Sequence, residues 1–161
     1  MWVSATWWPE GVPLSTGQLL ERRFKMAPEL RRYEIDMPAG KTVLFWKPNA
    51  KYSDNAFRSI MAWSGITSYN GRLKVRGVIE VKERQLYLIS LGDGTEFPLY
   101  SQHQSANLRP ALQQNELDPL VKLRLEAAAK KHQLVTIEGP LFMSLRPPVG
   151  IIVEHMEITD E

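Results

Sequence analysis

The chain has 161 residues and a net charge of +2, and its apolar fraction of 43% is ordinary for a globular protein. It contains no cysteine, which excludes disulfides, thiolate metal sites and cysteine nucleophiles. It has no apolar run near the roughly 20 residues of a membrane span, and its start lacks the pattern of a signal peptide. We therefore expect a soluble, cytoplasmic protein.

Charge is distributed unevenly along the chain. Residues 1–71 carry nine basic and six acidic side chains, whereas residues 72–161 carry eleven basic and twelve acidic ones. This differs from the strongly basic composition of a protein that coats DNA. Any nucleic-acid site must therefore depend on local patches of charge.

The N-terminal part gives few signals of secondary structure. Ser15 or Thr16 can cap a short helix over the following residues, LLERRFKM. Residues 41–46 (KTVLFW) predict a strand, and residues 53–63 predict a capped helix. The stretch 68–71 (SYNG) contains the turn dipeptide Asn-Gly and predicts a linker. One face of the second helix is expected to be apolar through Phe57, Ile60 and Met61.

The pattern becomes clear from Arg72, where apolar and charged residues alternate as in a half-buried strand. Asp118 and Pro119 suit the cap and first position of a helix. The predicted strands are 72–82, 86–91, 95–100, 134–141 and 151–158, with the helix between the third and fourth.

This order predicts a mainly β fold with α elements, a five-stranded Greek-key barrel with a helix between strands 3 and 4. An α+β N-terminal extension or small subdomain over residues 1–71 precedes the barrel at residues 72–161. Gly77 and Gly139 fall where the strands of such small barrels bend.

Four segments resemble oligonucleotide/oligosaccharide-binding (OB) domains: VRGVIEV at 75–81, LYLISLGDGTEFPLY at 86–100, LVTIEGPLF at 134–142 and GIIVEHMEI at 150–158. The resemblance covers a little over half of the chain. It implies a ligand face on strands 2 and 3, flanked by the loops between strands 1 and 2 and between strands 4 and 5.

Carried onto this sequence, the ligand face supplies rings that stack on bases and cations that bind phosphates. Alternatively, the tyrosines cover the barrel and the basic residues are solvated. The candidate nucleic-acid-binding residues are Lys74, Arg76, Lys82, Arg84, Tyr87, Tyr100, Phe142 and Arg146.

Three N-terminal tryptophans, Trp2, Trp7 and Trp8, form a second candidate site. Tryptophans are frequent anchors of protein interfaces, so these residues could bind a partner. Alternatively, they complete the core of the N-terminal part.

Catalysis has little support. His103, His132 and His155 lie far apart, and no pair has metal-ligand spacing. Neither a nucleophile elbow nor a phosphate-binding loop is present. We expect a non-enzymatic protein without metal or cofactor. Two functions stay open: an accessory protein that binds single-stranded DNA or RNA through an OB face, and a non-catalytic protein–protein interaction subunit of a larger assembly.

Overall fold

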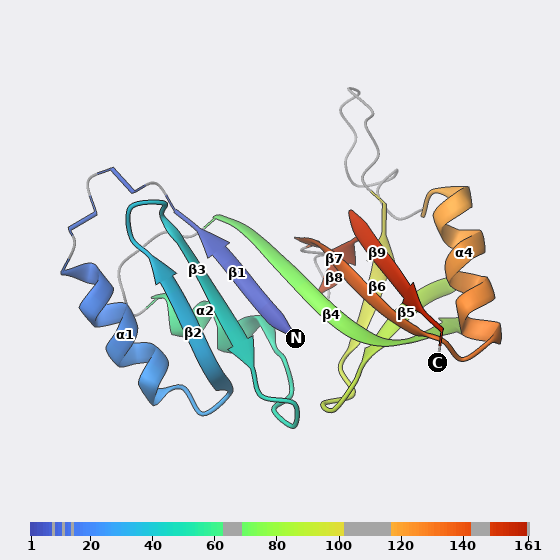
Figure 1. Ribbon diagram of the computed structural model, residues 1–161, viewed down its shortest axis with the longest axis horizontal. Coiled ribbons are helices and arrows are strands. Elements are labelled where there is room, and N and C mark those ends of the chain that lie inside the picture. The colour runs from blue at the N-terminus through green and yellow to red at the C-terminus, as the bar shows by residue number, and fades with distance from the viewer. Residues whose placement is uncertain are drawn as a thin grey trace.

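The computed structural model describes residues 1–7, 9–10, 12–13, 15–62, 69–101, 117–142 and 149–160, with the backbone alone at residues 54, 62, 69, 70 and 142. Within these residues the chain forms nine strands in one sheet and three helices, arranged as two lobes (Figure 1). The prediction of a mainly β fold with α elements is therefore confirmed.

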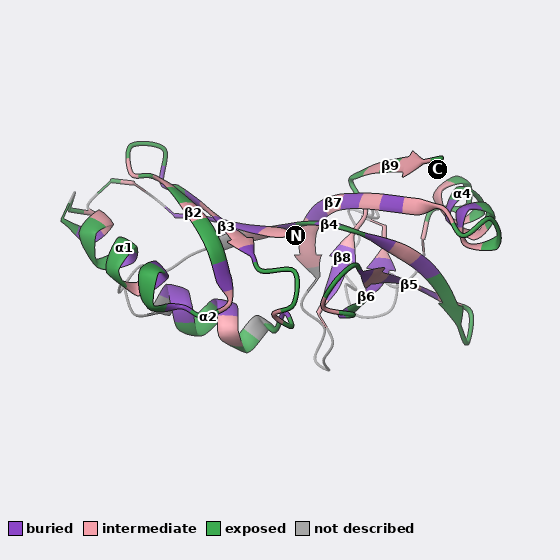
Figure 2. Ribbon diagram, turned by 60° about the horizontal axis from the view of Figure 1, so that its bottom comes forward, coloured by how far each residue is buried: buried purple, intermediate pink, exposed green. Residues whose placement is uncertain are grey.

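The N-terminal lobe is an antiparallel sheet in the order β2-β3-β1-β4. Both of its helices lie on one side of the strands (Figure 2). Phe24 of the first helix packs on Tyr33 of β2, with ring centroids 5.3 Å apart. The opposite side of this sheet is not covered by a helix. The elements are β1 (Trp2–Thr6), α1 (Thr16–Met26), β2 (Leu30–Asp36), β3 (Lys41–Trp46) and α2 (Asp54–Ala62).

The C-terminal lobe is a partly ring-like sheet. Its strands pair in the order β4-β5-β6-β8-β7, and β7 pairs again with β4. All of these pairs are antiparallel except β6 with β8. The elements are β4 (Tyr69–Lys82), β5 (Gln85–Ser90), β6 (Glu96–Tyr100), α4 (Pro119–Lys130), β7 (Leu134–Phe142), β8 (Gly150–Ile152) and β9 (His155–Thr159).

Strand β4 belongs to both lobes. Its first residues pair with β1, residues 72–77 pair with β7, and residues 77–82 pair with β5. The predicted linker is wrong at residues 69–71, because this stretch already forms β4. The division into residues 1–71 and 72–161 stays a prediction.

A buried core continues from one lobe into the other. The ring of Tyr52 lies 5.2 Å from that of Trp46 and 5.7 Å from that of Phe97. The backbone N–H of Tyr52 also donates to the carboxylate of Asp93 at 3.1 Å. The lobes are therefore joined by packing as well as by β4.

Most predicted elements are present. The 41–46 strand and the first helix are confirmed, and Phe57, Ile60 and Met61 are buried as expected. Asp118 caps α4 by accepting from the Leu120 N–H at 2.9 Å. The last predicted strand is divided into β8 and β9. Strands β1 and β2 are findings without a prediction.

Candidate nucleic-acid interface

The predicted ligand face on β5 and β6 brings three of its residues together. Tyr87 lies opposite Pro98 of β6, and Tyr100 follows two residues later on the same side. The Lys82 Nζ lies 5.7 Å from the centre of the Tyr87 ring. Burial raises the pKa of Tyr100, and the nearby Tyr87 adds to the rise. This face therefore holds two aromatic rings and one cation.

Carboxylates neutralise that cation. The Lys82 Nζ lies 2.6 Å from Glu96 and 3.2 Å from Glu80. Hydrogen bonds to Glu96 and then Glu80 raise the pKa of Lys82. Arg84 is exposed in the turn before β5, with φ of 66°. A phosphate approaching Lys82 would meet two negative charges there, so this face is poorly suited to a polyanion.

Lys74 and Arg76 lie elsewhere, on the stretch of β4 that runs past β1 and β7. Eight residues separate Lys74 from Lys82, which is up to about 26 Å along an extended strand. Lys74 lies opposite Trp2 on one side and Glu138 on the other. The predicted cations thus divide between two surfaces.

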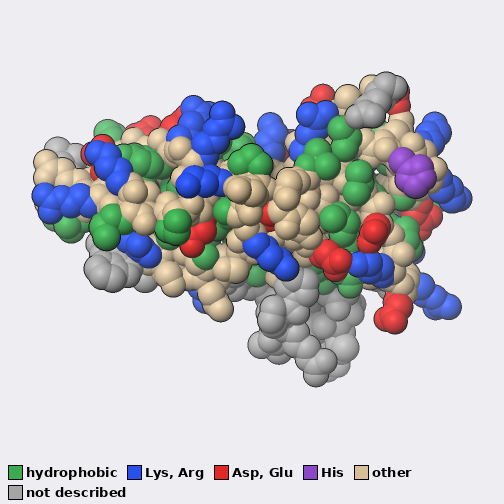
Figure 3. All heavy atoms as spheres, turned by 90° about the horizontal axis from the view of Figure 1, so that it is seen from below, with side chains coloured by type: hydrophobic (Ala, Val, Ile, Leu, Met, Phe, Trp, Pro, Cys, Tyr) green, Lys and Arg blue, Asp and Glu red, His purple; other side chains and the backbone are tan. Residues whose placement is uncertain are grey.

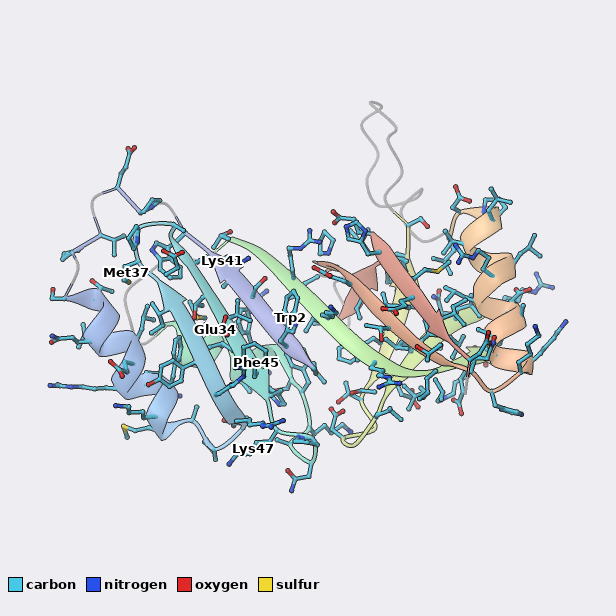
Figure 4. The ribbon with its side chains drawn as sticks, in the orientation of Figure 1. Trp2, Glu34, Met37, Lys41, Phe45 and Lys47 are labelled. Atoms are coloured by element: carbon cyan, nitrogen blue, oxygen red, sulfur yellow. The ribbon has the colours of Figure 1, made fainter. Side chains whose placement is uncertain are left out.

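A row of aromatic and basic residues crosses the uncovered side of the N-terminal sheet. Trp2 lies opposite Phe45 of β3 and opposite Lys74 of β4. Phe45 lies opposite Arg32 of β2, whose guanidinium carbon is 3.8 Å from the centre of the Phe45 ring. We call Arg32, Phe45, Trp2 and Lys74 the aromatic row. Figure 4 shows Trp2 and Phe45 on adjacent strands, on the side of the sheet turned toward the viewer.

Strand alternation explains why these side chains remain accessible. In β3 the residues at 42, 44 and 46 are buried, whereas Phe45 is half-buried and Lys41 is exposed. Successive side chains of a strand point to opposite faces. The buried set packs beneath the helices, so the other set, which includes Phe45 and its partner Trp2, faces solvent.

The same face continues into the C-terminal lobe. Beyond the aromatic row, Lys74 pairs across strands with Glu138 of β7, and Glu138 pairs with His155 of β9. Six strands side by side span about 24 Å at ordinary strand spacing. Arg72 is the neighbour of Lys74 on the same face of β4. Its guanidinium nitrogens lie 3.9 Å from a carboxylate oxygen of Glu138 and 2.8 Å from one of Glu154. Toward the N-terminal lobe, Arg32 lies 3.7 Å from the Glu34 carboxylate, whereas Lys74 forms no ion pair within the described residues.

A hollow of about 470 Å³ adjoins the aromatic row where the lobes meet. Three of the residues that line it are arginines, and none is acidic. Figure 3 shows lysine and arginine side chains spread over the face seen from below, with carboxylates among them. The lining residues are Met1, Arg31, Arg32, Phe45, Trp46, Pro48, Arg76 and Leu91.

The structure also locates the predicted partner residues. Trp2 is half-buried in the aromatic row, whereas Trp7 is 2% exposed and packs in the N-terminal core. Trp8, Arg146 and the side chain of Phe142 lie outside the described residues. Their proposed roles stay predictions.

Sequence reasoning did not identify Arg31, Arg32 or Phe45. Phe45 could have been identified from the alternation of residues 41–46, which places Lys41, Val43 and Phe45 on one face of the strand. A phenylalanine on the same face as the charged Lys41 would have needed an explanation. Its pairing with Trp2 depends on the order of strands, which the pattern does not encode.

Other kinds of site find no support in the described part of the chain. It holds no cluster of three or more His, Asp or Glu side chains that could bind a metal ion. Among its helices, none is both long enough and apolar enough to cross a membrane. Comparisons with protein-family models, with curated proteins and with solved structures found no match to this chain.

Proposed function

We propose that this protein is an accessory protein that binds single-stranded DNA or RNA, and that its C-terminal lobe is a five-stranded Greek-key barrel of the OB type. The pairing order β4-β5-β6-β8-β7-β4, with α4 between β6 and β7, supports the second part. Fold alone does not define a function, so the first part rests on the surface.

The aromatic row carries the proposal. Trp2 and Phe45 are adjacent, half-buried rings with Lys74 and Arg32 at the two ends of the row. Binding of single strands without strong sequence preference needs aromatic faces for bases and cations for phosphates. The bases of a duplex are already stacked on one another. A flat aromatic surface therefore favours the unpaired strand.

The aromatic row supports this function better than the β5–β6 face does. Lys82 is paired with Glu80 and Glu96, whereas Lys74 makes no ion pair within the described residues. Releasing Lys82 to a phosphate would leave two carboxylates unpaired beside it. The proposal thus keeps Lys74 and Arg76 from the predicted set and adds Trp2, Phe45 and Arg32.

Tryptophan fluorescence tests the proposal directly, because Trp2 lies in the surface concerned. We expect single-stranded DNA or RNA to quench the fluorescence with an affinity that falls steeply with salt, by a slope of about 0.7 per neutralised phosphate. A duplex of the same length should bind more weakly. Absence of binding at low salt, or a preference for the duplex, would overturn the proposal.

A protein partner is the second candidate, and α4 provides the observation that favours it. Leu120 is 73% exposed and Leu123 is 63% exposed, three residues apart and hence neighbours on the helix surface. Adjacent exposed leucines are typical of interaction surfaces. Replacing both with serine should abolish capture of a partner but leave oligonucleotide affinity unchanged, if both functions exist.

A further inference from the structure

We propose that the hollow where the lobes meet binds one phosphodiester group of the single strand, while the adjoining base stacks on the Arg32 guanidinium that lies over Phe45. This inference rests on the proposed function and makes it specific. It assigns the phosphate to Arg31 and Arg76, one from each lobe.

The hollow combines charge with an aromatic surface. Arg31 and Arg32 come from β2, Arg76 comes from β4, and Phe45 lies between them in β3. Its volume of about 470 Å³ lies within the roughly 300–1,000 Å³ of small-molecule sites. That is space for a nucleotide unit rather than for a lone anion.

A bulge in β2 explains why two consecutive arginines reach the same hollow. The pairing register of β2 with β3 shifts between Leu30 and Arg32. Neighbouring residues in a regular strand point to opposite faces, and a bulge breaks that alternation. Arg31 and Arg32 are accordingly both exposed and both line the hollow.

The backbone on the other side of the hollow is also held in place. The carbonyl oxygen of Arg76 accepts a hydrogen bond from the Leu91 N–H at 3.0 Å. The turn that follows packs on the N-terminal lobe, because a Cβ at Gly92 would lie 2.3 Å from the Pro48 carbonyl oxygen. Arg76 thus lines the hollow from a strand whose backbone is held in place.

The three arginines differ in what they already bind. The Arg32 guanidinium lies over the Phe45 ring and 3.7 Å from the Glu34 carboxylate. Within the described part of the chain, Arg31 and Arg76 form no ion pair and no cation–π contact. Their donors are available to an anion, and guanidinium groups match phosphate oxygens in geometry and charge.

The neighbouring ring selects a nucleotide over other anions. Phe45 lines the hollow and also lies opposite Trp2, so a strand that leaves its phosphate between Arg31 and Arg76 can place one base on the Arg32 guanidinium over Phe45 and the next on Trp2. An acidic peptide would satisfy the arginines but not the rings. We therefore assign the site to a phosphodiester flanked by bases.

The test compares salt dependence between matched variants. The variants are Arg31→Ala, Arg76→Ala, their combination, and the control Arg124→Ala, an exposed arginine of α4. Binding of single-stranded oligonucleotides that carry no terminal phosphate is measured by fluorescence titration at several salt concentrations. Circular dichroism checks that each variant is folded.

Each of the two replacements should reduce the slope of log affinity against log salt, and the combination should reduce it by about 0.7 in total, because both arginines neutralise a single phosphate. The control should keep the full slope, although it removes the same charge. Arg76→Lys should keep the slope but lose affinity, because lysine lacks the bidentate fork. These results would support the assignment.

Three results would overturn it. The first is a salt dependence of affinity in Arg31→Ala and Arg76→Ala that equals that of the control. This result would contradict the assignment of the phosphate but would not contradict the proposed function. Another is binding that requires a terminal phosphate on the oligonucleotide. The third is competition by polyglutamate as effective as that by unlabelled oligonucleotide. A wild-type protein that binds no oligonucleotide would refute the proposed function itself, and with it this inference.

Discussion

Trp2 and Phe45 lie directly opposite each other in the antiparallel pair of β1 and β3, on the side of the sheet that carries no helix. Side chains in such a cross-strand pair have Cβ atoms about 4.5–5.5 Å apart. Both aromatic residues are half-buried, so the fold leaves part of this apolar pair accessible. The proposed function gives this surface a ligand.

The first prediction concerns these two rings. Trp2→Ala and Phe45→Ala should each weaken binding of single-stranded nucleic acid by about 1–3 kcal/mol, because a base then loses its stacking surface. Trp2→Phe should retain most of the affinity. Fluorescence anisotropy of a labelled oligonucleotide measures both effects, since it does not depend on the tryptophan that is replaced.

Tyr87→Ala provides the matched comparison, because it removes a half-buried ring from the β5–β6 face. We expect its affinity to remain close to that of the wild type. A large loss in Tyr87→Ala together with an unchanged Trp2→Ala would place the ligand on the face implied by the OB resemblance instead.

A second prediction follows from the raised pKa of Tyr100, which is caused first by burial and then by Tyr87. The folded state holds the phenol proton more tightly than the unfolded state does. The stabilising contribution is therefore complete below the usual tyrosine pKa of 10.0 and is lost as the pH rises through the higher folded value.

Urea unfolding below and above the usual tyrosine pKa measures this effect. The free energy of unfolding should fall as the pH rises, and the fall should be smaller in Tyr100→Phe, which has no proton to lose. The same decline in both proteins would show that Tyr100 does not contribute.

The sequence predicted the elements in which one face alone is buried. In β4 the alternation of Leu73, Val75 and Ile79 with charged residues matches their burial. By contrast, β1 buries the consecutive residues 3–5, so it shows no alternation. The bulge after Leu30 similarly interrupts the pattern of β2. Both unpredicted strands thus lack the period on which sequence reasoning depends.

The candidate site was predicted only in part for a different reason. Lys74 and Arg76 were identified as cations, and Trp2 as a possible interface residue. Their arrangement around Phe45 comes from β1 lying between β3 and β4. This neighbourhood is a property of the chain topology, and no local pattern of residues specifies it.

A third prediction concerns the close approach of backbones at Gly77, which lies between the part of β4 that pairs with β7 and the part that pairs with β5. A Cβ there would lie 2.0 Å from the carbonyl oxygen of Ile89. Gly77→Ala should therefore force the two strands apart and destabilise the protein by about 1–3 kcal/mol or more.

Thermal unfolding measures this loss, with Gly94→Ala as the control. Gly94 has φ of 70° but no atom within 4 Å of an added Cβ. Gly94→Ala should therefore lose only the about 1–2 kcal/mol of stability that a Cβ costs in the left-handed conformation. Equal stability of Gly77→Ala and the wild type would contradict the close approach.

The last prediction is a stabilising change at the end of α4. His132 has φ of 54°, and its N–H donates to the carbonyl oxygen of Ala129, while the Gln133 N–H donates to that of Ala128. These two bonds form a Schellman motif, in which the left-handed position is usually glycine. A histidine there keeps the motif but bears the steric cost of its Cβ.

His132→Gly should therefore raise the free energy of unfolding by about 1 kcal/mol. Chemical denaturation measures the change, and His132→Ala separates its causes, because alanine removes the imidazole but retains the Cβ. We expect little or no gain from alanine. If both variants stabilise the protein equally, the imidazole rather than the backbone conformation is the source of strain. If neither does, the end of α4 tolerates the left-handed histidine because its side chain makes a compensating contact.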